Sequence, residues 1–304
     1  MAMNPVTAKW QTHLLGTMLL LYMLARICQL YADRLPALLI VILHVVPPAV
    51  FAAVHGSILY RGRGMLAFTT FCAGVACLCE SLSLRTGFPF GHYYFTNVMG
   101  PKIFNLPVLL ILAYLGIGYC SWVLSLLILG YRNKPLVGAR VVALPILASF
   151  IMLAWDLSME PDWATVDHAW IWRDGGPFFG VPISNFLGWY LTAYLFYQAF
   201  ALYCRARPVQ PPPTSRSYWR APILFYGICA FGNLLLLRLP MAPPVVMDAT
   251  GKPWITMDIL RTDALMSLLV MGPMALLAWL RLREKESDPN EAHQVSVVRT
   301  MQPE

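Results

Sequence analysis

Three carboxylates at the ends of apolar runs are the residues of this sequence best suited to proton-transfer chemistry: Asp156, Glu160 and Glu80. A spacing of four places Asp156 and Glu160 on one face of a helix. A carboxylate near a helix C-terminus is disfavoured by the partial negative charge there, and partial burial acts in the same direction. Such groups are suited to donate protons near neutral pH. We therefore interpret these three residues as candidate acids and bases.

The same acids also suggest a metal site. Asp156, Glu160 and Asp162 could hold Mg²⁺ against a diphosphate, as in an intramembrane prenyltransferase. Such sites usually need a second acid-rich motif, for which Asp258 and Asp263 in "MDILRTD" are the candidates.

A structural role is the third alternative. Arg26, inside an apolar run, and Arg238, at the end of another, could form ion pairs with the acids. We expect Asp162, Asp167 and Asp174 to be loop residues at the interface, either solvated or in structural ion pairs. Ionisable residues within membrane spans, in contrast, are functional candidates by default.

The composition indicates a polytopic membrane protein. Of 304 residues, 58% are hydrophobic and 12% are charged, whereas soluble domains have about 25% charged residues. A spanning helix needs about 20 mostly apolar residues. The sequence therefore predicts an all-α helical bundle with about eight membrane spans: 12–32, 37–60, 64–82, 106–130, 138–158, 183–204, 220–239 and 262–282. The third is short and the last is interrupted by Gly272-Pro273, so seven spans are the alternative. We expect one transmembrane domain over 1–283 and a polar, disordered tail over 284–304.

The basic residues predict the orientation. Thirteen lie on the side of the N-terminus: Lys9, Arg61, Arg63, Arg132, Lys134, Arg140, Arg205, Arg207, Arg216, Arg220, Arg281, Arg283 and Lys285. Six lie on the other side: Arg34, Arg85, Lys102, Arg173, Lys252 and Arg261. The positive-inside rule then predicts a multi-pass protein of the inner membrane with both termini in the cytoplasm. The three long, aromatic-rich connections, 83–105, 159–182 and 240–261, and the candidate acids are expected on the outer side. Since the charge of +7 is scattered over span ends, we expect no nucleic-acid partner.

The histidines argue against oxygen chemistry at a di-iron centre. All six are dispersed, without the clustered spacing that such a centre needs: His13, His44, His55, His92, His168 and His293. Nor does a phosphate-binding glycine-rich loop occur. The sequence therefore predicts no metal and no redox cofactor.

Two turn-rich blocks carry a resemblance to a known family: "TGFPFGHYYFT" (86–96) and "GVPISNFLGW" (180–189), with "AWDLSMEP" (154–161) as a looser match. Together they resemble the membrane family of carotenoid biosynthesis proteins, which includes the carotenoid 1,2-hydratases and the bisanhydrobacterioruberin hydratases. The resemblance covers roughly residues 64–200.

This resemblance implies an acid-catalysed hydration of a polyene end group without a cofactor. Its expected partners are a lipid-soluble carotenoid, water and membrane lipid. Asp156, Glu160 and Glu80 would do the chemistry. The end group would be bound by residues of these blocks and a neighbouring tryptophan: His92, Tyr93, Tyr94, Asn185, Trp189 and Trp155. Three alternatives stay open beside this one: a cyclase that uses the same acid step, the Mg²⁺-dependent prenyltransferase, and a non-catalytic polyene-binding protein.

Overall fold

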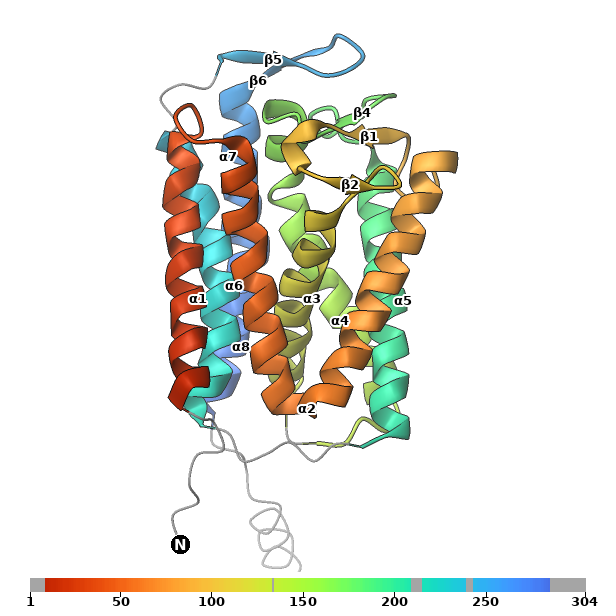
Figure 1. Ribbon diagram of the computed structural model, residues 1–304, viewed down its shortest axis with the longest axis vertical. Helices are drawn as coiled ribbons and strands as arrows, with labels where there is room; N and C mark the ends of the chain where they lie inside the picture. Colours follow the sequence, from red (N-terminus) through yellow and green to blue (C-terminus); the bar gives the residue numbers. More distant parts are fainter. Residues whose placement is uncertain (1–8, 133, 209–214, 239–242, 285–304) are drawn as a thin grey trace, which may run out of the picture.

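Long helices lie side by side in the bundle of Figure 1, a computed structural model that describes residues 9–132, 134–208, 215–238 and 243–284. In chain order they are α1 (Lys9–Cys28), α2 (Ala37–Thr86), α3 (Val108–Ile128), α4 (Arg140–Leu157), α5 (Ile183–Ala206), α6 (Arg216–Leu235), α7 (Thr256–Met266) and α8 (Gly272–Arg283). The all-α membrane bundle predicted from the sequence is confirmed. The tail from Lys285 onward, expected to be disordered, lies outside the described residues.

The longest helix, α2, contains two passes of the bundle. Its backbone leaves helical geometry at Arg61, where φ is 59° and ψ is 173°. The chain reverses there, so that residues 37–60 and 62–86 run in opposite directions (Figure 1). This turn lies between the predicted spans 37–60 and 64–82. A helix of 50 residues is far longer than the about 20 residues that one membrane crossing requires.

The last pass is continuous despite its Gly272-Pro273 interruption. A π-helical turn, η5 (Ser267–Met271), joins α7 to α8, and the proline lies in the first turn of α8. The Gly272 amide just before this proline donates back to Ser267 O in the π-helical turn, so the two helices stay joined. The described residues thus form seven continuous helical segments and, with two passes in α2, eight passes. Six of these segments, all except α5, are long and apolar enough to cross a membrane.

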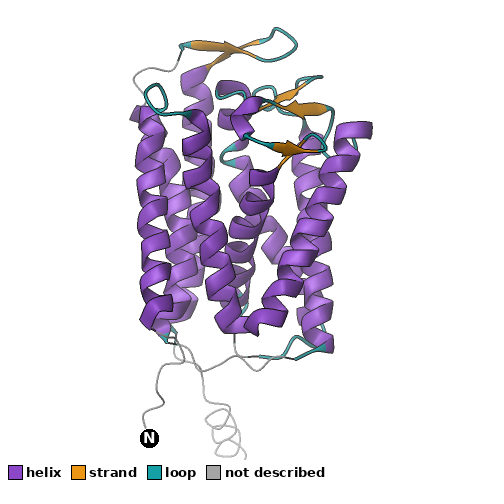
Figure 2. Ribbon diagram, in the orientation of Figure 1, coloured by secondary structure: helices purple, strands orange, loops and turns teal. Residues whose placement is uncertain are grey.

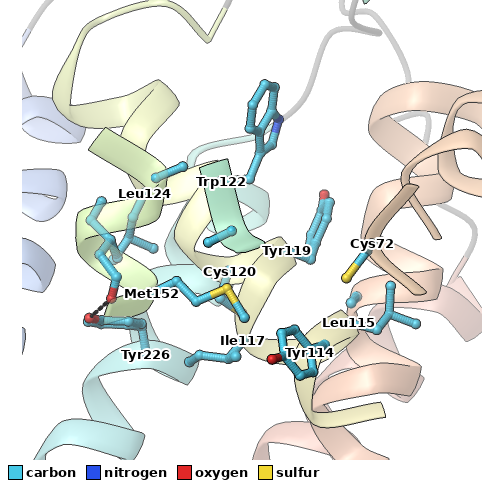
Figure 3. Close-up of a cluster of buried hydrophobic side chains, with 14 of the residues drawn as sticks. Cys72, Tyr114, Leu115, Ile117, Tyr119, Cys120, Trp122, Leu124, Met152 and Tyr226 are labelled. Atoms are coloured by element: carbon cyan, nitrogen blue, oxygen red, sulfur yellow. Dashed lines mark hydrogen bonds between the residues drawn. The ribbon is translucent and has the colours of Figure 1, made fainter. Parts of the chain in front are cut away.

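The centre of the bundle is α3, which is buried on almost every side. Its sequence is apolar all round, as expected of a helix enclosed by other helices. It packs against α2, α4, α6 and α8, and Figure 3 shows its side chains Tyr114 to Leu124 among buried neighbours. At Gly116, an added Cβ would lie 2.5 Å from the Pro48 side chain and 2.9 Å from its backbone carbonyl carbon. Gly116 therefore permits the close approach of α2 and α3.

Gly116→Ala is expected to destabilise the protein by about 1–3 kcal/mol, since the new methyl group overlaps backbone that cannot rotate away. Thermal unfolding of the purified protein in detergent measures this change. Gly74→Ala is the matched control, because no atom lies within 4 Å of an added Cβ at Gly74. Equal melting temperatures for the two variants would contradict the proposed contact between α2 and α3.

Three two-stranded antiparallel sheets gather at one end of the bundle, here called the hairpin end (Figure 2). They pair β1 (Tyr93–Phe95) with β4 (Trp170–Trp172), β2 (Lys102–Ile103) with β3 (Leu106–Pro107), and β5 (Val245–Met247) with β6 (Pro253–Ile255). Five of these strands lie in the three long connections expected on one side of the membrane, and β3 takes up the first two residues of the predicted span 106–130. The opposite end holds the start of α1 and the end of α8 (Figure 1).

Candidate active site

The three carboxylates singled out in the sequence lie together near the hairpin end, inside the protein. Asp156 is in the last turn of α4, Glu160 follows that helix, and Glu80 comes from the second pass of α2. Their exposed fractions are 0% for Asp156, 2% for Glu160 and 4% for Glu80. None of the three forms an ion pair within the described residues, so hydrogen bonds from neutral groups must satisfy them.

Two tyrosine hydroxyls donate hydrogen bonds to the buried carboxylate of Glu80. The hydroxyl of Tyr93, in β1, donates to one carboxylate oxygen, and the hydroxyl of Tyr114, in α3, donates to the other at 2.7 Å. Burial, and next the charge of Glu80, raise the pKa of the Tyr93 phenol well above its usual value. Tyr93 therefore stays protonated and remains a donor to Glu80.

Two tryptophan indoles donate hydrogen bonds to the buried carboxylate of Glu160. The Nε1 atoms of Trp170 and Trp172 donate to its Oε1 at 2.7 and 2.8 Å. Both indoles come from β4, where alternate residues face the same side of the sheet, and both are buried. The register of the sheet places Tyr93 opposite Trp172, so β1 and β4 together cover the carboxylates from the hairpin end.

Asp156 differs from the other two acids because one of its oxygens accepts no hydrogen bond from the described residues. Its Oδ2 accepts from the Asn185 side-chain amide at 3.1 Å, whereas its buried Oδ1 has no hydrogen-bond partner. Asp156 and Glu160 both line one cavity. A carboxyl group can carry a proton and donate it, or accept one when ionised, so the two residues are chemically suited to proton transfer.

A central cavity of about 70 Å³ holds Asp156 and Glu160 in its wall. The rest of its lining is mainly apolar and aromatic, and includes Trp155, Trp163, Trp170 and Trp189. A smaller cavity of about 30 Å³ adjoins it and is lined by Glu80, Asn185 and again Glu160 and Trp189. The three acids therefore surround two neighbouring apolar spaces. This is the environment in which a carboxylic acid can protonate an apolar substrate.

Four of the six residues expected to bind substrate lie at these cavities: Trp155, Trp189, Tyr93 and Asn185.

The other two, His92 and Tyr94, lie at the surface. His92 contacts Asp174 through its Nδ1 at 3.0 Å, with 57% of its side chain exposed, and Tyr94 is 45% exposed. The alternation of β1 explains this placement: Tyr93 and Phe95 face inward, so Tyr94 faces outward.

The expectation that Asp162 is a loop residue was wrong. Asp162 is buried at 6% exposure in a π-helical turn, η3 (Asp162–Val166), which continues the chain beyond α4. Pro161 keeps helical backbone angles and caps this turn, because proline is tolerated at the start of a helix. Asp167 and Asp174, in contrast, are exposed as expected.

The proposed ion pairs and the proposed Mg²⁺ motif do not assemble in the described part of the chain. Arg26 donates to the side-chain oxygen of Asn233, not to a carboxylate, and no described acid forms an ion pair with Arg238. Asp162 lines a cavity separate from that of Asp156 and Glu160. The spacing of the three acids in sequence therefore does not bring them to one point.

Tyr114, Trp170 and Trp172 are contacts of the acids that sequence reasoning missed as donors. Trp170 and Trp172 belong to an alternating "WIW" segment in one of the aromatic-rich connections, where nothing in the sequence distinguishes them from other aromatic residues. Tyr114 is one of many aromatic residues in the spans, and its donor role depends on the packing of α3 beside α2.

Tyr93→Phe removes one donor to Glu80 and is expected to destabilise the protein by about 1–3 kcal/mol, since a buried carboxyl oxygen loses its partner. The measurement is thermal unfolding in detergent, followed by tryptophan fluorescence. Tyr94→Phe, one residue further along the same strand, should leave the melting temperature unchanged because Tyr94 faces outward. A loss of stability in Tyr94→Phe as large as in Tyr93→Phe would contradict this assignment.

Comparison with known proteins shows the family of the chain. A family model described as "Carotenoid biosynthesis protein" matches residues 35–250, which include all three acids and both cavities' principal walls. The chain belongs to this family. A curated relative, the bisanhydrobacterioruberin hydratase of Haloarcula japonica, is 29% identical over 136 residues, or 43% of this chain and 41% of the relative. The chain thus matches less than half of that relative's length. No solved structure matches the chain.

Proposed function

We propose that this member of the carotenoid biosynthesis family is a hydratase that adds water to a terminal carbon–carbon double bond of an acyclic carotenoid. The observation that carries the proposal is the buried pair of Asp156 and Glu160 in an aromatic-lined cavity, with one Asp156 oxygen free of any described donor. A relative that is named as a hydratase supports the same reaction class.

The reaction proceeds in two steps. Asp156 gives its proton to the less substituted carbon of the double bond, and the π electrons form the new C–H bond, which leaves a tertiary cation. Water then attacks the cation through its oxygen, the proton that it loses goes to Glu160, and Glu160 returns a proton to Asp156. The sum is one alkene plus one water to one tertiary alcohol, and the acid is regenerated. No oxidant, reductant or metal ion is consumed.

The cavity wall supports the cationic intermediate. Trp155, Trp163 and Trp189 line the central cavity, and an aromatic ring attracts a cation over its face more strongly when water is excluded. Asn185 holds Oδ2 of Asp156 and leaves Oδ1 directed to the substrate. Glu160, held by two indoles, lies beside Asp156 to accept the proton of the attacking water.

Co-expression with a pathway that makes an acyclic carotenoid tests the proposal, with mass spectrometry of the pigments. The expected product is the carotenoid plus the mass of water. An isomer of unchanged mass with a ring would identify a cyclase, in which an alkene captures the same cation. Added prenyl units that depend on Mg²⁺ would identify a transferase. An unchanged pigment bound to the protein would identify a binding protein. Each of these three results would refute the hydratase.

The orientation is a further part of the proposal. Because basic residues are concentrated at the end opposite the hairpin end, we infer that the opposite end faces the cytoplasm of a cell whose inner membrane holds the protein. A reporter that is active only outside the cytoplasm should be silent when fused after Arg283. The same reporter should be active when inserted at Phe104, which is 91% exposed in the β2–β3 turn. The reverse pattern would place the acids near the cytoplasmic side.

A further inference from the structure

A third and larger cavity opens at the hairpin end, and is here called the outer vestibule. It measures about 310 Å³. Its lining begins with the exposed residues Ala32, Asp33 and Ala37 and ends with the buried residues Val41 and His44. Gln29, Asp162 and Asp167 add polar groups to its wall. The outer vestibule thus leads from the surface into the bundle along a partly polar path.

The outer vestibule and the central cavity share a wall. Val41, His44 and Trp163 line both of them. The ring of His44 meets that of Trp163 edge to face at 5.8 Å between centroids, and its nitrogens contact Ile40 O at 2.8 Å and Gln29 Oε1 at 3.2 Å. We call the shared wall of Val41, His44 and Trp163 the partition. It separates the surface-connected space from the space that holds Asp156.

Beyond the partition, two buried polar atoms point to water as the molecule that crosses it. Arg26 Nε and Asp156 Oδ1 have no hydrogen-bond partner among the described residues, and both side chains line the central cavity. A buried donor or acceptor without a protein partner is usually satisfied by an ordered water. A cavity of about 70 Å³ is large enough for water. A water molecule both donates and accepts hydrogen bonds, so it can satisfy the Arg26 N–H and either protonation state of the Asp156 carboxyl group.

We propose that the outer vestibule admits the water that the reaction consumes, and that this water passes the partition of Val41, His44 and Trp163 to reach Asp156 and Glu160. This inference rests on the proposed hydratase function. It assigns the hairpin end as the source of the second substrate, while the carotenoid is taken up from the lipid. Polar side chains along the outer vestibule favour water over the apolar substrate, because an apolar chain would desolvate them without replacing their hydrogen bonds.

Blocking the mouth of the outer vestibule tests the inference. Ala37→Cys places a thiol in its lining, and Leu38→Cys places one on the next residue, which is exposed but does not line it. Both variants are treated in membranes with a bulky, membrane-impermeant maleimide, with the treated parent chain as background for the native cysteines. Labelling of Ala37→Cys is expected to lower hydration by about ten-fold or more, which corresponds to about 1.4 kcal/mol of barrier, and labelling of Leu38→Cys should leave it unchanged. Full hydration by labelled Ala37→Cys would overturn the inference.

A second measurement separates the failure of this inference from that of the proposed function. Val41→Cys lies in the partition and is expected to react with a small charged thiosulfonate added from the hairpin side, although Val41 is only 2% exposed. Leu115→Cys, buried in α3 and absent from the lining of both cavities, should not react above background. If unlabelled protein hydrates no carotenoid, the proposed function fails, and the Val41→Cys reaction still decides whether the outer vestibule reaches the partition. An unreactive Val41→Cys would overturn the inference in either case.

Discussion

Asp156→Asn is expected to lower the rate of carotenoid hydration by about 10²-fold or more, because asparagine cannot supply the proton. The shape of the side chain and its contact with Asn185 can be kept, since the asparagine oxygen can accept the same hydrogen bond. The measurement is hydrated product formed per unit of folded protein in membranes, with protein quantified after gel filtration in detergent. The variant should elute and melt like the parent.

Asp174→Asn is the control for this experiment. It makes the same chemical change at an exposed aspartate, whose contact with His92 lies at the surface. Its hydration rate should equal that of the parent. Near-normal hydration by Asp156→Asn would show that Asp156 is not the acid, and Glu160 and Glu80 would then be tested in the same assay.

Glu160→Gln should have the second-largest effect, a loss of about ten-fold or more in hydration. Glutamine retains an oxygen that can accept from Trp170 and Trp172, so both indoles keep a partner and folding should survive. The variant loses the carboxylate that receives the proton of the attacking water. The cation should then lose a proton and return to the alkene more often than it is captured.

Deuterium oxide makes this change visible. In D₂O, each return of the cation to the alkene can leave deuterium in the recovered carotenoid, whereas capture gives deuterated alcohol. The ratio of deuterated alkene to deuterated alcohol should therefore rise in Glu160→Gln, while Asp156→Asn should show little of either product. An equal ratio in Glu160→Gln and the parent would contradict a role of Glu160 in the capture step.

The sequence was sufficient for the positions of the spans because most of them carry their own apolar signal; among the described segments, α5 is the exception. Runs of about 20 apolar residues identify membrane helices without knowledge of their neighbours. The reversal at Arg61 and the continuous last pass agree with the predicted spans. Asp156 and Glu80 were also accessible from sequence, since a carboxylate within an apolar run is unusual by itself.

The partners of the acids were not accessible in the same way because they depend on long-range pairing. Trp172 reaches Glu160 only when β4 pairs with β1, and their register follows from the packing of connections far apart in the chain. The same register turns Tyr94 outward, which a list of aromatic residues in a motif does not predict. Asp162 was misplaced because Pro161 suggested the end of a helix, whereas here it begins a π-helical turn.

The source of the product's oxygen tests the central claim most directly. Purified protein is supplied with an acyclic carotenoid in water enriched in ¹⁸O, under anaerobic conditions and without added metal, and the product is analysed by mass spectrometry. Acid-catalysed hydration predicts a hydroxyl group that carries ¹⁸O, formed by the parent and not by Asp156→Asn. A product without oxygen from water, whether a cyclised isomer or an unchanged carotenoid, would contradict it.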